Sequence, residues 1–185
     1  MNQAQIDKAI KLHSKWLDNS SGGRQLILNN KSLLQVNLVC KNLIRADLSG
    51  SDLSVANLSH SNLLGANLTG ANLLGANLTG ANLIGANLIG ARYNPVLLLS
   101  MINWGCVSEE LNQLLMAYDA QNHPNPERFN EWYDTGICPY NNIKFERSVK
   151  FIQMRRLWDE RLIKKKLPSA FKLFKMCCEE KDIKI

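Results

Sequence analysis

Residues 66–90 read ANLTGANLLGANLTGANLIGANLIG, with a leucine at every fifth position. The spacing continues on both sides, so that thirteen leucines follow one another from Leu28 to Leu88. An α-helix rotates residues five apart by about 140°, and a flat strand points them to alternating faces. Neither element can bury such a series on one side. A chain that turns a corner every five residues can bury all of them.

Small residues stand two positions before the leucines, where alternation along an extended segment points them inward. These residues are Ala46, Ser51, Ala56, Ser61, Ala66, Ala71, Ala76, Ala81, Ala86 and Ala91. Glycine frequently stands two positions after the leucine, where it suits a tight corner. Lys31 and Lys41 take the inward position in the first repeats. Since a charged lysine is unstable in a dry interior, we expect a distorted first coil or lysines that reach sideways to water.

The motif A-(N/D)-L-x-G of residues 46–90 resembles the pentapeptide repeat family. The resemblance implies a right-handed quadrilateral β-helix with four repeats per coil. The fold expected is therefore mainly β with α, a solenoid flanked by helical caps. The leucines and Tyr93 mark fourteen repeats, about 3.5 coils, and at a strand spacing of about 4.8 Å the rod is about 17 Å tall.

Sequence on both sides of the repeats predicts the caps that the open ends of a solenoid need. Residues 4–18 have apolar positions at helical spacing, and the NSSGG of residues 19–23 ends that helix. Ser108 is predicted to cap a second helix, and a short third helix follows Pro126. We therefore divide the chain into an N-terminal helical cap (1–24), a β-helix (25–94) and a C-terminal helical extension with a basic tail (95–185).

The flanking stretches also carry a resemblance. Residues 13–23, with Trp16 and a Gly-Gly pair, resemble a leader of some pentapeptide repeat proteins, and residues 104–140 resemble a C-terminal extension of uncharacterised members. No run of eighteen apolar residues and no signal-peptide core is present. Five cysteines without a CxxC motif favour free thiols in a reducing compartment, so we expect a cytoplasmic protein.

Catalytic and metal-binding patterns are weak. Cys106, His123 and Cys138 are separated by 17 and 15 residues, which matches no compact zinc motif. A Cys–His nucleophile pair would need a cleft that the repeats do not offer, and there is no glycine-rich phosphate loop. We therefore expect no enzyme, no metal, no cofactor and no small-molecule substrate. His60 should be a solvated corner residue. The asparagines before the leucines, such as Asn67 and Asn87, should form amide ladders between coils.

Positive charge is concentrated in the tail. Residues 1–143 hold nine Lys/Arg and ten Asp/Glu, a net of −1, whereas residues 144–185 hold thirteen and six, a net of +7. The candidate basic tail comprises Arg155, Arg156, Lys164, Lys165, Lys166, Lys172 and Lys175. Interleaved with aromatic residues, it could bind nucleic acid or an anionic membrane surface. The competing interpretation is a pair of short helices with packed apolar faces and solvated lysines, separated at Pro168.

One outward column is apolar in every coil. At twenty residues per coil, the position after each leucine places Ile44, Leu64 and Ile84 on one face, whereas every other face includes polar residues. A stacked apolar strip should be covered by protein. We expect this candidate interface to hold the C-terminal helices of the same chain, a second copy in a homodimer, or an unknown protein partner.

The resemblance implies one known activity, mimicry of duplex DNA by the quinolone-resistance members, which protect DNA gyrase. The short rod matches only about five base pairs, and its repeats are not acidic. The charged residues from 28 to 91 are Lys31, Lys41, Arg45, Asp47 and Asp52. We therefore expect a non-catalytic protein-interaction or scaffold module. The alternative is a nucleic-acid- or membrane-associated protein that acts through its basic tail.

Overall fold

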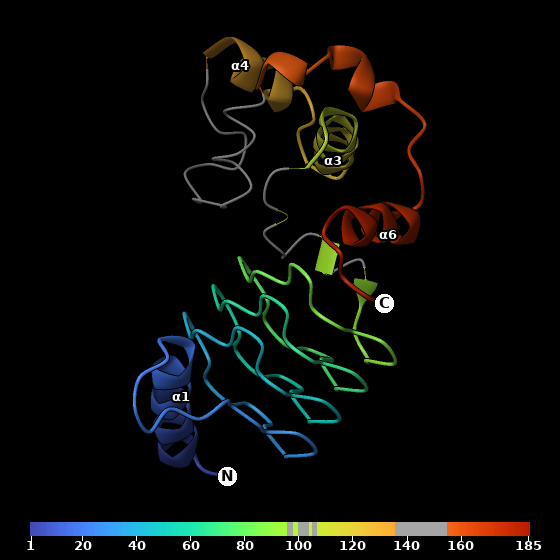
Figure 1. The fold of residues 1–185 in the computed structure, drawn as a ribbon. Helices are drawn as coiled ribbons and strands as arrows, with labels where there is room; N and C mark the ends of the chain where they lie inside the picture. The colour runs from blue at the N-terminus through green and yellow to red at the C-terminus, as the bar shows by residue number, and fades with distance from the viewer. Residues whose placement is uncertain (96–97, 100–103, 105–106, 136–154) are drawn as a thin grey trace. The chain divides into compact units, whose positions relative to one another are not determined.

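In a computed structural model of the chain, the described residues are 1–95, 98–99, 104, 107–135 and 155–185 (Figure 1). The chain divides into two compact units. The first comprises Met1–Asn103 together with Cys178–Ile185, and the second comprises Trp104–Cys177. The last eight residues therefore group with the repeats, a return of the chain that the sequence did not predict.

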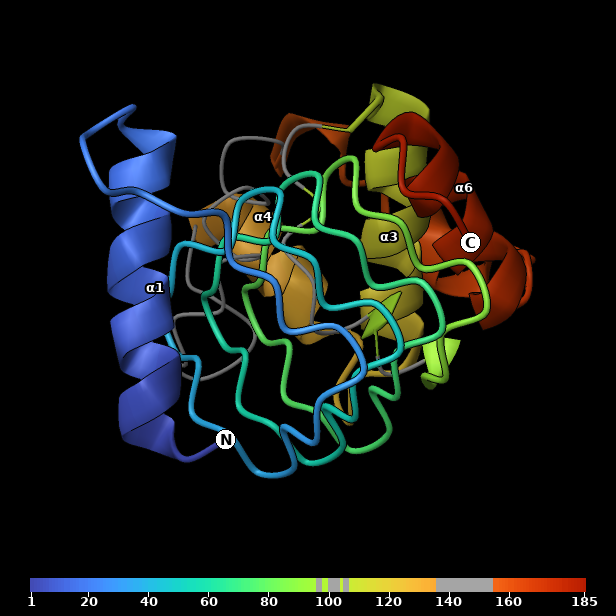
Figure 2. The ribbon, with the colours of Figure 1, turned by 60° about the horizontal axis from the view of Figure 1, so that its bottom comes forward.

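Residues 27–92 form a β-helix-like solenoid with twenty residues per coil (Figure 2). Parallel bridges pair residues twenty apart, from Ile27 with Asp47 to Asn72 with Arg92. The Leu28 N–H donates to the Asp47 carbonyl at 2.8 Å, and equivalent bonds recur along the rod. The bridges are isolated, and no longer strand is assigned in the described residues, because the chain turns every five residues.

The leucine ladder is confirmed as the core of the solenoid. All thirteen leucines from Leu28 to Leu88 are at most 3% exposed, and each contributes about 1.5–3 kcal/mol relative to exposure. The small inward residues from Ala46 to Ala86 are also buried. Ser51 and Ser61 donate their hydroxyl groups to the carbonyls three residues earlier, at 2.6 and 2.7 Å. Both of these buried hydroxyl groups are therefore hydrogen-bonded within the narrow interior.

The first coil is regular, since its bridges begin at Ile27. Lys31 is exposed, and the Lys41 ammonium lies 3.5 Å from the Asp7 carboxylate. Of the two alternatives for this coil, distortion or lysines that reach sideways, the second is confirmed. Val36 occupies the inward position between them and is buried.

Corners of the coils adopt the left-handed backbone conformation whichever residue is present. Seven glycines two positions after a leucine have φ between 62° and 71°. Six other residues there have φ between 53° and 57°: Asn30, Gln35, Cys40, Arg45, Val55 and His60. Coil geometry thus overrides residue preference, at a cost that is greatest for the β-branched Val55.

Helix α1 (Gln3–Leu17) caps the first coil, as predicted. Its N-cap is Asn2, which forms a capping box with Gln5. Ile6, Ile10 and His13 are its buried residues. The helix ends before Asn19, which has φ 54°. Figure 1 places α1 and the C-terminus of the chain at opposite ends of the solenoid.

The last residues of the chain extend the solenoid at its other end. Lys184 forms a parallel bridge with Asn87. The Leu88 N–H donates to the Lys184 carbonyl at 2.7 Å, and the Lys184 N–H donates to the Ala86 carbonyl at 3.0 Å. The Gly85 N–H donates to the Lys181 carbonyl at 2.9 Å. Residues 181–184 therefore occupy the place of a further coil.

The described residues of the second unit form helices joined by loops. The helices described there are α3 (Glu109–Gln121), α4 (Arg128–Thr135), the 3-10 helices η1 (Arg155–Leu157) and η2 (Glu160–Lys164), and most of α6 (Ala170–Glu180). Ser108 caps α3 as predicted and accepts from the Leu111 N–H at 3.2 Å. Phe129 and Trp158 pack with ring centroids 5.3 Å apart. None of the described helices combines the length and the apolarity that crossing a membrane requires.

Candidate interaction surfaces

Side chains that precede the leucines brace the turns of the solenoid. Asn67 Oδ1 accepts from the Thr69 N–H at 3.2 Å and from the Thr69 hydroxyl at 2.7 Å. The same bond from the N–H two residues later recurs at every such position from Asn37 to Asn87. Side-chain bonds between coils occur at three of the predicted positions: Asn82 donates to Asn62 at 3.1 Å, whereas Asn67 and Asn72 donate to Asp47 and Asp52 at 3.2 and 3.0 Å. These polar groups therefore serve the fold.

The predicted column Ile44, Leu64 and Ile84 lies in register across three coils. The Arg45 N–H donates to the Leu64 carbonyl at 2.9 Å, and the Gly65 N–H donates to the Ile84 carbonyl at 2.8 Å. Leu64 is 37% exposed, and the two isoleucines are half-buried. The role of this column as an interface stays a prediction.

A second outward set of apolar residues is more exposed. Leu34, Val55 and Leu74, here called the apolar corner cluster, are 53%, 56% and 40% exposed. They occupy consecutive coils, because the Val55 N–H donates to the Leu74 carbonyl at 3.0 Å and the Gln35 N–H donates to the Ser54 carbonyl at 3.2 Å. The position after each leucine does not predict this cluster, because Ser54 interrupts the apolar column there. The signal lies at the corner position, where Val55 stands two residues after Leu53.

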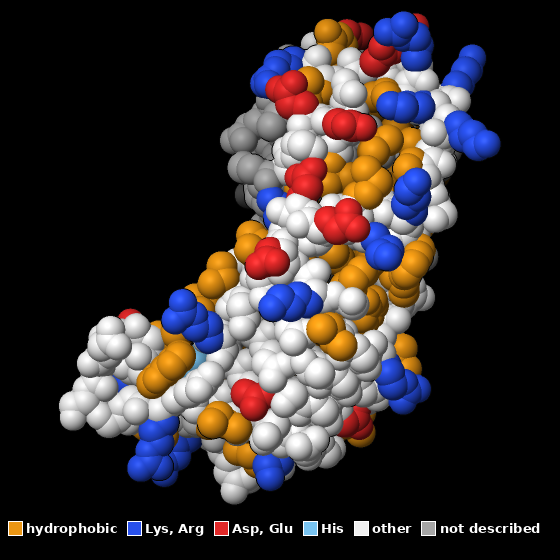
Figure 3. All heavy atoms as spheres, turned by 45° about the vertical axis from the view of Figure 1, so that its right-hand side comes forward, with side chains coloured by type: hydrophobic (Ala, Val, Ile, Leu, Met, Phe, Trp, Pro, Cys, Tyr) orange, Lys and Arg blue, Asp and Glu red, His pale blue; other side chains and the backbone are white. Residues whose placement is uncertain are grey.

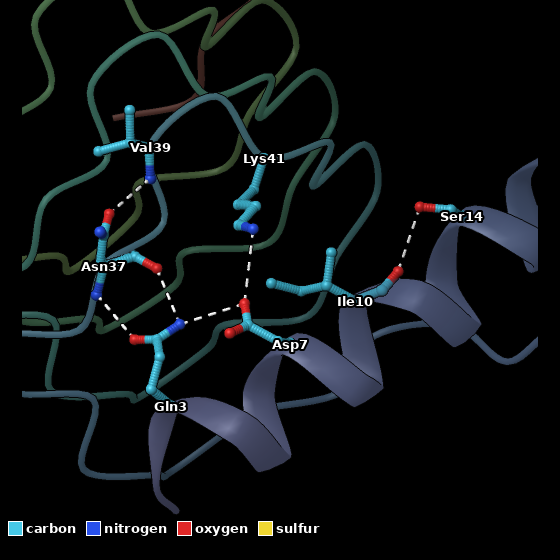
Figure 4. Close-up of polar contacts among 7 residues, drawn as sticks. All are labelled: Gln3, Asp7, Ile10, Ser14, Asn37, Val39 and Lys41. Carbon is cyan, nitrogen blue, oxygen red and sulfur yellow. Dashed lines mark hydrogen bonds and ion pairs between the residues drawn. The ribbon is translucent and has the colours of Figure 1, made fainter.

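The N-terminal edge of the solenoid is occupied by α1 (Figure 4). The Gln3 side chain bonds to both the N–H and the carbonyl of Asn37, at 3.1 and 3.0 Å, and also donates to Asp7 at 3.2 Å. Farther along α1, buried His13 accepts from the Leu26 N–H through Nδ1 at 3.1 Å. Burial lowers the pKa of His13, so the ring stays neutral and keeps its acceptor. Asn37 and Leu26 at this edge are therefore paired within the chain.

Most of the candidate basic tail is exposed in the second unit. Lys164, Lys165, Lys166, Lys172 and Lys175 are all exposed, whereas the Arg155 side chain lies outside the described residues. Arg156 forms an ion pair with Glu109 at 2.6 Å. In Figure 3, basic side chains gather along one edge of this unit. The tail is not one continuous helix: η2 ends at Lys164 and α6 begins at Ala170, with Pro168 between them, as predicted.

The metal hypothesis concerns residues of which two, Cys106 and Cys138, lie outside the described part of the chain. The third, His123, holds the Asn125 N–H through Nδ1 at 3.0 Å. In the part of the chain that the structure describes, no three His, Cys, Asp or Glu side chains are grouped for metal binding. His60 is exposed at its corner, as expected.

An open pocket of about 300 Å³ lies in the second unit. Its described lining residues are Asn130, Tyr133, Asp134, Trp158 and Glu160. Trp158 is fixed there by its Nε1–H, which donates to Asn130 Oδ1 at 3.0 Å. This lining includes no cysteine, histidine or lysine that could act as a nucleophile or base beside the two carboxylates.

Comparison with protein families finds pentapeptide repeats in eight copies, over residues 32–64, 42–73 and 61–92. Comparison with curated proteins finds no match. Among solved structures, the pentapeptide repeat protein Rfr23 of the cyanobacterium Cyanothece 51142 is 38% identical, with 37% of this chain and 53% of that chain covered and a TM-score of 0.33.

Two further solved structures are similar over the repeats. HetL of Nostoc sp. strain PCC 7120, involved in heterocyst differentiation regulation, is 38% identical over 35% of this chain and 30% of its own, with a TM-score of 0.33. A pentapeptide repeat protein of the Arabidopsis thaliana thylakoid lumen is 26% identical over 39% and 50%, with a TM-score of 0.37. The chain thus spans about half or less of the length of these three proteins.

Proposed function

The chain is a member of the pentapeptide repeat family, and we propose that it is a non-catalytic protein-interaction module whose solenoid presents an apolar contact surface. Proteins of this family are generally structural or interaction modules. The proposal includes the right-handed, four-sided form of the β-helix. Twenty-residue coils with a left-handed residue every fifth position support the four sides.

The observation that carries the proposal is the apolar corner cluster. Leu34, Val55 and Leu74 are each 40% exposed or more, although they lie on a rod whose interior is filled with leucine. Apolar residues that gather on consecutive coils are costly to leave in water, at about 25 cal/mol per Å². Because backbone pairing holds the coils in register, a partner would meet a preformed surface and lose little binding energy to ordering it.

Position-specific cross-linking tests this proposal. A photoactivatable residue at position 74 should cross-link a partner protein in native cells, and the same residue at position 79 should not. Thr79 follows a leucine one repeat later, on a different face. Leu34→Lys should abolish the cross-link from position 74, whereas Ser59→Lys should preserve it. Equal cross-linking from positions 74 and 79 would contradict the proposal.

The column Ile44, Leu64 and Ile84 is a second proposed contact surface. Lys181, which bonds to Gly85 beside this column, supports the view that part of it is approached by the C-terminal segment of the same chain. Leu64→Lys with Ile84→Lys should then make the C-terminal residues sensitive to protease while the protein keeps its mass in sedimentation. Dissociation of a dimer by this variant would assign the strip to a second copy.

We also propose a cytoplasmic location. The free thiol of exposed Cys40 supports it, together with the free thiol of buried Cys178. Labelling of Cys40 by a thiol reagent in intact cells would test this. Protection of Cys40 that is removed only by a reductant would contradict it.

A further inference from the structure

Residues 161–177 of the second unit carry six Lys/Arg and no Asp/Glu. Arg161 forms an ion pair with Asp159. The other five, Lys164, Lys165, Lys166, Lys172 and Lys175, are exposed, and none of them forms an ion pair with any residue that the structure describes. Here this stretch is called the basic segment. These five lysines make the segment locally positive, which favours an anionic partner.

The loop of the basic segment is held in place by α3. Gln121 Nε2 donates to the carbonyls of Leu162 and Lys165, both at 2.9 Å. Leu162 is buried, and the Lys165 N–H donates back to the Leu162 carbonyl at 3.2 Å. Three consecutive exposed lysines therefore extend from a fixed backbone, and an anion that binds them need not order the loop first.

Helix α6 places an aromatic ring among the lysines. Phe171 is 52% exposed and lies in the first turn, where Ser169 Oγ accepts from the Lys172 N–H at 3.2 Å. At about 100° per residue, Phe171, Lys172 and Lys175 share one side of the helix. The opposite side is already buried, with Leu173, Phe174 and Cys177 at 0% exposure.

We propose that the basic segment binds single-stranded nucleic acid, with its lysines on the phosphates and the Phe171 ring stacked on a base. A duplex offers no free base face to an aromatic ring. Binding to an anionic membrane would require an exposed apolar helix face for insertion. The apolar face of α6 is buried in protein, so only the Phe171 ring remains available for insertion. A flat exposed aromatic between cations fits an unpaired base better than a bilayer.

Binding of fluorescent oligouridine and oligothymidine to the full chain tests the proposal by anisotropy. For three to six phosphates neutralised, the logarithm of the binding constant should fall with that of salt concentration at a slope of about −2 to −4. Lys164→Gln, Lys165→Gln and Lys166→Gln together should make this slope shallower by about 2. Deletion of the tail is unsuitable because it also removes residues 181–184 from the solenoid.

The matched control replaces three lysines on another surface. Lys8, Lys11 and Lys15 of α1 are exposed, and their change to Gln alters the net charge by the same amount. This control should retain both the affinity and the salt slope. Equal losses in the two triple variants would show that net charge alone attracts the oligonucleotide, and would overturn the assignment to the basic segment.

Substitution of Phe171 distinguishes the two classes of anionic partner. Phe171→Leu keeps an apolar side chain but removes the flat ring, so oligonucleotide affinity should fall about 5- to 150-fold, as expected for a lost base stack. Vesicles rich in phosphatidylserine are the comparison probe. Binding to vesicles but not to oligonucleotides, with Phe171→Leu unaffected, would overturn the proposal in favour of a membrane surface. Absence of oligonucleotide binding at low salt would overturn it as well.

Discussion

The side-chain amide of Gln3 forms two hydrogen bonds with the backbone of Asn37, where a preceding coil would otherwise pair. Within the rod, the Asn57 N–H donates to the Val36 carbonyl at 2.9 Å, and the Asn57 carbonyl accepts from the Leu38 N–H at 2.7 Å. Asn37 has no earlier coil to pair with. Gln3 Oε1 accepts from its N–H at 3.1 Å, and Gln3 Nε2 donates to its carbonyl at 3.0 Å (Figure 4). One side chain thus pairs both backbone groups of Asn37 at the open edge.

Gln3→Met should remove both bonds and lower the free energy of unfolding by about 0.5–1.5 kcal/mol, because two exposed backbone groups at the edge exchange this partner for water. Urea denaturation measures the change. Lys11→Met, an exposed substitution on the same helix, is the control and should cost less than about 0.5 kcal/mol. Similar losses in both variants would contradict a capping role for Gln3.

Leu68→Ala should cost about 2–5 kcal/mol, because Leu68 is fully buried and its removal opens a cavity between coils. Leu64→Ala removes the same atoms one turn earlier, from a side chain that is 37% exposed, and should cost at most about 1 kcal/mol. Thermal unfolding compares the two. If the costs were equal, the inward and outward assignment of the leucines would be wrong.

Val55→Asn should raise the free energy of unfolding by about 1 kcal/mol, since a β-branched residue with φ 57° is strained and asparagine tolerates this conformation. Asn30 already occupies an equivalent corner with φ 53°. Val39→Asn lies outside the left-handed positions and should bring no gain. A loss of stability at position 55 would show that the corner carries no strain, and the same variant also probes the apolar corner cluster.

His13 should make stability depend on pH. Burial lowers its pKa, with the backbone of Ile44 opposing the shift as a weaker effect. As pH falls below about 6.5, the unfolded chain therefore takes up a proton before the folded chain does. Stability should be full above this pH and decline below it, until the lower folded pKa is reached. A protonated ring also could not accept from the Leu26 N–H.

His13→Gln retains an acceptor for the Leu26 N–H but cannot titrate. Its free energy of unfolding should vary less between about pH 7 and 5 than that of the parent chain. His60 and His123 are present in both proteins, so their contributions cancel in the comparison. Identical pH profiles would show that His13 does not govern the contact between α1 and the first coil.

The sequence predicted the interior of the rod because a five-residue repeat is a local rule. Each leucine is buried by residues twenty positions away that follow the same repeat. The burial of Leu68 and its neighbours could therefore be predicted from the repeat alone. Helix α1 and the start of α3 at Ser108 were likewise predictable, since caps and apolar spacing are written in adjacent residues. The candidate contact surfaces were only partly predictable from the sequence. The column of Ile44, Leu64 and Ile84 followed from the twenty-residue register, whereas the exposure of the corner residue Val55 did not.

The sequence by itself therefore determined the coil and its core, and only the tertiary structure decided how the coil ends. Gln3 pairs Asn37 of the first coil with its side-chain amide, and Lys184 extends the last coil with its own peptide group. An open edge requires only a donor and an acceptor at hydrogen-bonding distance. Every peptide group offers that pair, so no residue pattern marks the segment that returns to supply it, and its identity depends on where the folded chain runs.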